Sequence, residues 1–110
     1  MAKGIYRHSP LTEATYYILI SLTDPLHGYG IMKKVEEMSD GRIKLAAGTL
    51  YGALNTLLTN KLIQTAGEEE SNKRRKLYIR TEKGTDLVEY EIRRLREMFE
   101  NGINETGRGF

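Results

Sequence analysis

The sequence predicts a mainly α-helical fold with a small β-hairpin, in which a winged helix-turn-helix is followed by one long C-terminal helix. Three features predict it. Leucines recur at the spacing of one helix face, at positions 50, 54, 57 and 58. Two short strand-like segments follow, and a basic run, Lys73-Arg74-Arg75-Lys76, lies at the turn between them. A helix in this position can enter a major groove while the hairpin reaches the adjacent backbone, so the order predicts DNA binding.

Length and composition restrict the class of protein. The chain has 110 residues, so we expect a single domain over 1–110. It has no apolar run near the roughly 18 residues that span a bilayer and no signal-peptide segment after Met1, so we expect a cytoplasmic protein that does not bind membranes. Cysteine is absent, and His8 and His27 are not at metal-binding spacing. We therefore expect no disulfide, no metal and no cofactor.

The positive charge is concentrated in one segment. Residues 73–83 have a net charge of +5, whereas the whole chain has +2. Such a cluster can neutralise phosphates, although a solvated hairpin tip is the alternative interpretation.

Only one local pair, Asp24 with His27, suggests catalysis. The turn between two helices explains this pair better, so we do not expect an enzyme.

Capping residues and apolar periodicity predict where each element begins and ends. Ser9 is expected to cap the first helix, with Pro10 at its first position, and Thr81 to cap the last, which ends near Asn101-Gly102. In the second strand, Leu77 and Ile79 are expected to face inward. The expected helices cover residues 10–24, 31–39, 48–60 and 82–100, and the expected strands cover 61–66 and 76–81.

The outward face of the helix over 48–60 has no charged residue. Small polar side chains there suit close approach to a DNA groove, whereas a plain surface helix of low helix propensity is the alternative.

On the last helix, Val88, Ile92, Leu95 and Phe99 form an apolar stripe that a small core cannot cover, so the distal half is expected to pack on a second copy. Its alternating arginines and glutamates, Glu91 among them, are expected at solvated or inter-subunit edges.

Several motifs together resemble the PadR family of bacterial transcriptional regulators. They are Leu26-His27-Gly28-Tyr29-Gly30-Ile31, Gly48-Thr49-Leu50-Tyr51, Lys61-Leu62-Ile63, Lys73-Arg74-Arg75-Lys76-Leu77-Tyr78 and Thr81-Glu82-Lys83-Gly84. The resemblance covers roughly residues 10–100. It implies a homodimeric winged-helix repressor of the short subclass, with a recognition helix around 48–60, a wing around 67–75 and a dimerising last helix. Two departures are Lys61, where the family has a glycine-type turn residue, and the absence of tryptophan, on which multidrug-binding relatives stack flat ligands.

Together these interpretations predict a homodimeric regulator that binds an inverted-repeat operator, with a small apolar or phenolic effector as a further expectation. A winged-helix module that binds only proteins is the alternative, but it has no need of the basic wing. The DNA-binding core and wing are expected over about 9–81, the dimerisation helix over 82–100 and a tail over 101–110. The expected DNA contacts are Tyr29, Lys33, Thr49, Tyr51, Asn55, Thr56, Lys73, Arg74, Arg75 and Arg80. The expected dimer contacts are Val88, Ile92, Leu95, Met98 and Phe99, and the expected effector contacts are Tyr16, Tyr17, Met98 and Phe99.

Overall fold

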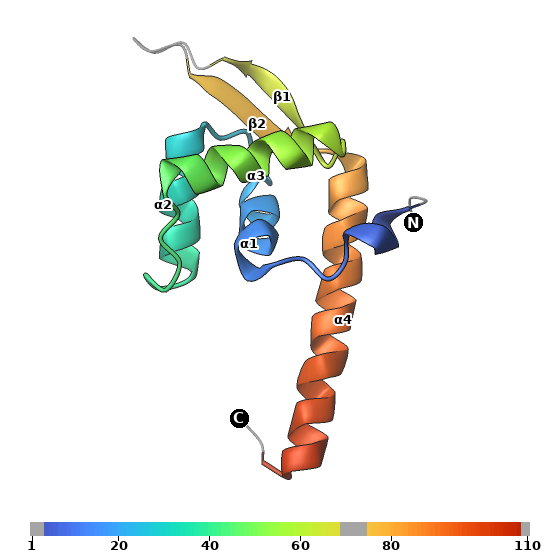
Figure 1. Cartoon of the computed structure of the whole chain (residues 1–110). Coiled ribbons are helices and arrows are strands. Elements are labelled where there is room, and N and C mark those ends of the chain that lie inside the picture. Colours follow the sequence, from blue (N-terminus) through green and yellow to red (C-terminus); the bar gives the residue numbers. More distant parts are fainter. Residues whose placement is uncertain (1–3, 69–74, 109–110) are drawn as a thin grey trace.

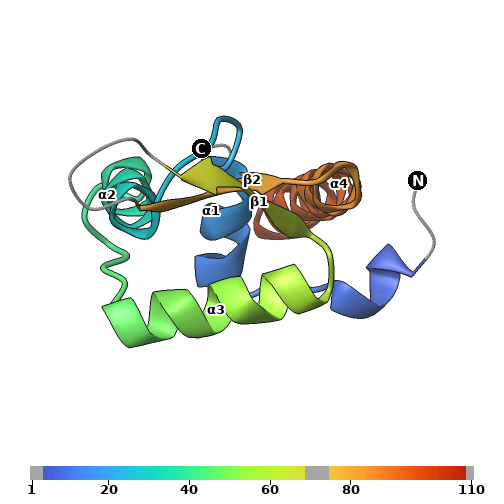
Figure 2. The same ribbon diagram turned by 90° about the horizontal axis from the view of Figure 1, so that it is seen from above.

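The computed structural model describes residues 4–68 and 75–108 and confirms the mainly helical fold with one hairpin (Figure 1). Seen from above, α3 spans the width of the body and the hairpin lies over α1 (Figure 2). No helix in the described ranges is long and apolar enough to cross a membrane. The elements in chain order are the 3-10 helix η1 (Ile5–His8), α1 (Glu13–Ser21), α2 (Gly28–Met38), α3 (Ala47–Thr59), β1 (Ile63–Glu68), β2 (Lys76–Arg80) and α4 (Glu82–Thr106).

Helix α1 begins later than the sequence predicts. Its N-cap is Thr12, whose hydroxyl accepts a hydrogen bond from the backbone N–H of Thr15 at 3.2 Å. The hydroxyl of Ser9 instead donates to the Glu91 carboxylate of α4 at 2.7 Å. The predicted Ser9 cap is therefore wrong, because the helix begins only at Glu13 and Ser9 lies against α4 instead.

The core lies where α1, α2, α3 and the first turns of α4 meet. On α3 the expected leucine face is buried, except for Leu58, which is only half-buried. Each fully buried side chain of this size contributes about 1.5–3 kcal/mol to stability, so this cluster holds the helices together. Its helical members include Ile18, Leu19, Ile31, Val35, Leu50, Leu54, Leu57, Leu87 and Val88.

The hairpin joins the core through Ile63 of β1 and Tyr78 of β2. The antiparallel strands pair Thr65 with Tyr78, and the register shifts between Thr65 and Glu68. Tyr78 is buried, and its backbone exchanges two hydrogen bonds, of 2.8 and 3.0 Å, with Leu26 in the segment before α2. The prediction that Leu77 and Ile79 face inward is wrong, since both are only half-buried.

A tight turn brings the end of α3 against the start of α4. Lys61 adopts the left-handed conformation, with φ of 60°, at the position where the resembling family has a glycine-type residue. The carbonyl of Leu62 then lies so close to Gly84 that a Cβ there would be 2.1 Å from its oxygen. The Thr81 cap is confirmed, because its hydroxyl accepts from Gly84 N–H at 3.1 Å. Gly84 is thus needed for this close approach.

Helix α4 continues through the expected stop at Asn101-Gly102 and ends at Thr106, where Gly107 takes the left-handed conformation with φ of 67°. The prediction that it ends near residue 100 is wrong. A glycine inside a helix costs only about 1 kcal/mol relative to alanine, which the flanking turns can offset. The helix extends far beyond the rest of the fold (Figure 1), so its distal half lacks intramolecular cover.

Candidate nucleic-acid interface

The outward face of α3 is exposed along its length and carries no charged side chain. Leu50, Leu54 and Leu57 turn the opposite face into the core. The hydroxyl of Thr56 donates to the carbonyl of Gly52 at 3.2 Å and keeps its acceptor lone pairs. No atom comes within 4 Å of where a Cβ on Gly52 would be, so this part of the face allows close approach. The exposed face consists of Thr49, Tyr51, Gly52, Asn55, Thr56 and Thr59.

Tyr51 connects α3 with the start of α2. A Cβ on Gly28 would lie 2.3 Å from the Tyr51 hydroxyl oxygen and 2.8 Å from the ring carbon that bears it. Only glycine therefore lets the tyrosine ring rest against the first turn of α2. The ring remains partly exposed, so Tyr51 is both positioned by the fold and available at the surface.

A pocket of about 350 Å³ lies between the start of α2, Tyr51 and the wing. We call it the α2–wing pocket. Burial, followed by the neighbouring Tyr51, raises the pKa of Tyr78 in its wall, so this phenol stays neutral. The DNA contacts expected from the sequence do not include Gly28, His27 or Lys76, although Lys76 belongs to the basic run and the other two lie in the Leu26–Ile31 motif. The lining residues are His27, Gly28, Tyr29, Tyr51, Arg75, Lys76 and Tyr78.

His27 caps α2 and also approaches the wing. Its Nδ1 accepts a hydrogen bond from the backbone N–H of Gly30 at 3.0 Å, and its Nε2 lies 3.3 Å from a terminal nitrogen of Arg75. This contact places the Arg75 guanidinium at the edge of the pocket, and the guanidinium has further N–H donors besides the one that faces His27.

The other DNA contacts predicted from the sequence are exposed in some cases and bonded within the fold in others. Tyr29 and Lys33 are exposed on α2. Arg80 is instead engaged within the fold, since its Nε donates to Thr85 at 2.9 Å and a terminal nitrogen donates to the carbonyl of Leu19 at 2.7 Å. The guanidinium of Arg80 joins β2 to α1 and α4. Lys73 and Arg74, also predicted as contacts, lie outside the described residues.

The apolar stripe of α4 divides into two parts. Val88 is buried in the subunit's own core, so the structure does not bring it together with the other predicted dimer contacts. The other predicted dimer contacts lie further along α4 and are exposed, with exposed fractions of 46% for Ile92, 38% for Leu95, 55% for Met98 and 58% for Phe99.

A second pocket, of about 330 Å³, lies between α1 and α4. Among the predicted effector contacts, Tyr16 and Tyr17 line this α1–α4 pocket, whereas Met98 and Phe99 do not. Burial and then the neighbouring Tyr17 and Glu91 raise the pKa of Tyr16. Its lining residues are Leu11, Glu13, Tyr16, Tyr17, Arg42, Glu91, Arg94 and Leu95. No cluster of three potential metal ligands occurs within residues 4–68 and 75–108.

The fold and this surface define a winged-helix protein with an uncharged helix face beside a basic wing. The chain belongs to the PadR-like family of transcriptional regulators, whose sequence model matches residues 18–90. Because members of this family are regulators of transcription, the enzyme alternative is set aside.

Two solved structures agree with this assignment, and one curated relative of uncharacterized function is similar in sequence. A PadR family transcription regulator from Clostridium difficile R20291 matches with a TM-score of 0.71 and 25% identity over 88% of this chain and 100% of that one. A transcriptional regulator from Clostridium thermocellum matches with a TM-score of 0.68 and 26% identity over 84% and 90%. An uncharacterized 37.1 kDa protein in transposon TN4556 of Streptomyces fradiae is 36% identical over 80 residues, or 72% of this chain and 22% of that protein. This chain thus spans about a fifth of that relative's length.

Proposed function

We propose that this regulator is a homodimeric repressor that binds an inverted-repeat operator in the bacterial cytoplasm, with α3 in the major groove. The observation that carries the proposal is the uncharged, exposed face of α3 beside the basic α2–wing pocket. Thr49, Tyr51, Asn55 and Thr56 then read base edges from this face. Asparagine pairs well with adenine in the major groove, and threonine offers both a hydroxyl and a methyl group.

Backbone contacts come from the surfaces on either side of α3. The first turn of α2 presents backbone N–H groups and the positive end of the helix dipole, next to the exposed Tyr29 and Lys33. Arg75 lines the α2–wing pocket, and its guanidinium has N–H donors besides the one that faces His27. Lys73 and Arg74 are assigned to phosphates from the sequence alone. Arg80 is left out, since its guanidinium already bonds within the fold.

The proposed dimer seam is the distal half of α4. Four large apolar side chains project there without cover from their own subunit, namely Ile92, Leu95, Met98 and Phe99. A second copy of the helix covers them in a two-fold arrangement, in which the same patch serves both subunits. Two recognition helices related by a two-fold axis read an inverted repeat, with half-sites about one helical turn, or a multiple of it, apart.

Relief of repression by a small molecule is a second candidate function, and the α1–α4 pocket favours it. The pocket adjoins Leu95 of the proposed seam and offers the rings of Tyr16 and Tyr17 to an apolar or phenolic compound. Such an effector must bind the DNA-free geometry better than the DNA-bound one. Thermal-shift screening of phenolic compounds tests this, and Tyr16→Ala should abolish any stabilisation that is found.

Sequencing the DNA that the purified protein retains from a fragmented genome tests the main proposal. Anisotropy titrations at several salt concentrations then follow on the enriched operator and on random DNA. Asn55→Ala should weaken operator binding by about 1–3 kcal/mol more than random binding. Arg75→Ala should weaken both and lower the salt slope by roughly one for each phosphate that is no longer neutralised. Arg93→Ala, an exposed arginine on α4, is the matched control. If no operator is enriched and Arg75→Ala equals this control, the protein-binding module is the better interpretation.

A further inference from the structure

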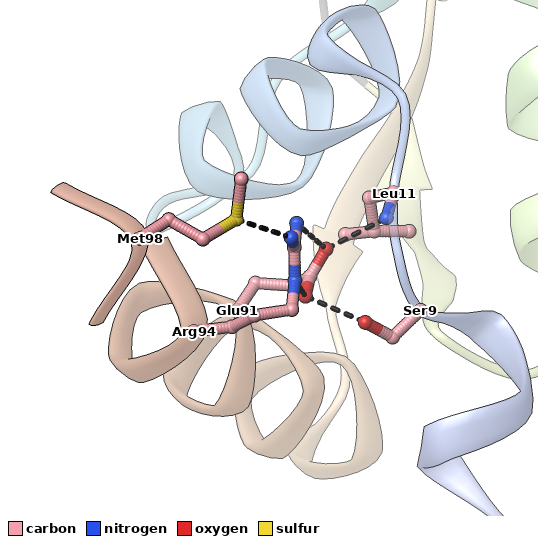
Figure 3. Close-up of polar contacts among 5 residues, drawn as sticks. All are labelled: Ser9, Leu11, Glu91, Arg94 and Met98. Carbon is pink, nitrogen blue, oxygen red and sulfur yellow. Dashed lines mark hydrogen bonds and ion pairs between the residues drawn. The ribbon is translucent and has the colours of Figure 1, made fainter. Parts of the chain in front are cut away.

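A buried carboxylate joins the N-terminal segment to α4. Glu91 is only 1% exposed, although the sequence predicts it at a solvated or inter-subunit edge. It accepts hydrogen bonds from the Ser9 hydroxyl at 2.7 Å and from the backbone N–H of Leu11 at 2.6 Å. From its own helix, Arg94 donates through Nε at 2.6 Å and through a terminal nitrogen at 3.1 Å. Figure 3 shows these contacts converging on one carboxylate, and we call the four residues the Glu91 cluster.

The cluster lies at the boundary between the two halves of α4. Leu87 and Val88, in the preceding turn, are in the core, whereas Ile92 and Leu95 begin the exposed stripe. The residues that Glu91 holds, at positions 9–11, lead directly into the Thr12 cap of α1. The cluster therefore stands where the winged-helix body meets the overhanging helix.

The hydrogen bonds of the Glu91 cluster depend on the relative direction of the N-terminal segment and α4. Burial by itself raises the pKa of Glu91, but the hydrogen bonds from Arg94, Leu11 and Ser9 outweigh it and lower the pKa. A buried charge is tolerated only while its partners stay in place, and removing one is strongly destabilising. Apolar contacts, by contrast, are non-directional and tolerate sliding. A change in the angle between the N-terminal segment and α4 would remove the donors of Ser9 and Leu11 and leave the buried carboxylate with Arg94 as its partner.

We propose that Glu91 is a positioning residue that sets the angle between the DNA-reading body and the dimer helix, and thereby the half-site spacing that the dimer accepts. The inference rests on the proposed function, because it needs a seam on the distal half of α4. One base-pair step is about 3.4 Å, so a small rotation at this joint changes the distance between the two recognition helices by enough to alter the preferred spacing.

The test compares Glu91→Gln and Ser9→Ala with Glu89→Gln, an exposed glutamate on the same helix. Sedimentation measures dimerisation. Anisotropy measures binding to a single half-site, to the operator, and to operators with one base pair added or removed between the half-sites. The wild type and Glu89→Gln should prefer the natural spacing by about tenfold, because a wrong spacing requires DNA deformation. Glu91→Gln and Ser9→Ala should remain dimers with unchanged half-site affinity, but their spacing preference should fall to about threefold or less.

A merely stabilising role for Glu91 would lower the melting temperature without changing the ratio between spacings. Dimeric variants that keep the wild-type spacing preference therefore overturn this inference and leave the proposed function standing. A wild-type protein that is monomeric, or that selects no operator, overturns both. If Glu91→Gln does not fold, Ser9→Ala decides, since it removes one donor at the half-buried end of the cluster and leaves the carboxylate paired with Arg94.

Discussion

Replacing Gly84 with alanine should destabilise the fold by about 3 kcal/mol. The new Cβ would lie 2.1 Å from the carbonyl oxygen of Leu62, whereas ordinary contact begins at 3.4 Å, so the α3–β1 turn must retreat by more than 1 Å. Three hydrogen bonds resist this movement: Thr81 N–H to Leu62 at 3.1 Å, the Thr81 hydroxyl to Lys61 at 2.7 Å, and Lys83 Nζ to Asn60 at 3.1 Å. Overpacking costs about 1–3 kcal/mol, and each strained bond adds up to about 1 kcal/mol.

Gly102→Ala is the matched control on the same helix. No atom lies within 4 Å of its added Cβ, so alanine should stabilise α4 by up to about 1 kcal/mol. Denaturant and thermal unfolding, both followed by circular dichroism, measure the free energy of unfolding and the melting temperature of each variant. All samples are kept at one protein concentration, because dimerisation contributes to stability. Gly84→Ala should lower the melting temperature by roughly 10–20 °C. Equal stabilities for the two variants would refute the close approach of Leu62 to Gly84.

Three further predictions concern single contacts. Lys61→Gly should raise the free energy of unfolding by up to about 1 kcal/mol, because it relieves a left-handed lysine; thermal melts of Lys61→Gly and Lys61→Val, which should be less stable, check this. Arg80→Ala should lower the melting temperature, whereas Arg75→Ala should leave it unchanged and weaken DNA binding, and the opposite pattern would refute the two assignments. The wild type should exceed Glu91→Gln in free energy of unfolding by a constant amount above pH 4.5, the ordinary pKa of the carboxyl group. This difference should shrink as the pH falls through the lowered pKa of Glu91 in the folded state, because protonation removes the charge that the cluster binds. A difference that does not change with pH in acid titrations would contradict this.

The sequence alone was enough to predict features that depend on residues close together in the chain. The α3 leucine face follows from helical periodicity, and the Thr81 cap bonds only three residues ahead. The left-handed turn at Lys61 also lies at a position where PadR family members have a glycine-type turn residue. In each case the interaction that decides the structure lies within a few residues of sequence, so pattern reasoning can detect it.

Only the tertiary structure decided between options that are locally equivalent. Ser9 and Thr12 can both cap a helix, but the structure places Ser9 against Glu91, 82 residues away, and Thr12 at the N-cap. Strand alternation in β2 allows either face to turn inward, and pairing with Leu26 selects Tyr78. Glu91 itself lies in helical register with Leu87 and Leu95, which was a readable signal, but its donors come from the opposite end of the chain. A buried charge or a strand face depends on contacts distant in sequence, and no local propensity encodes those contacts.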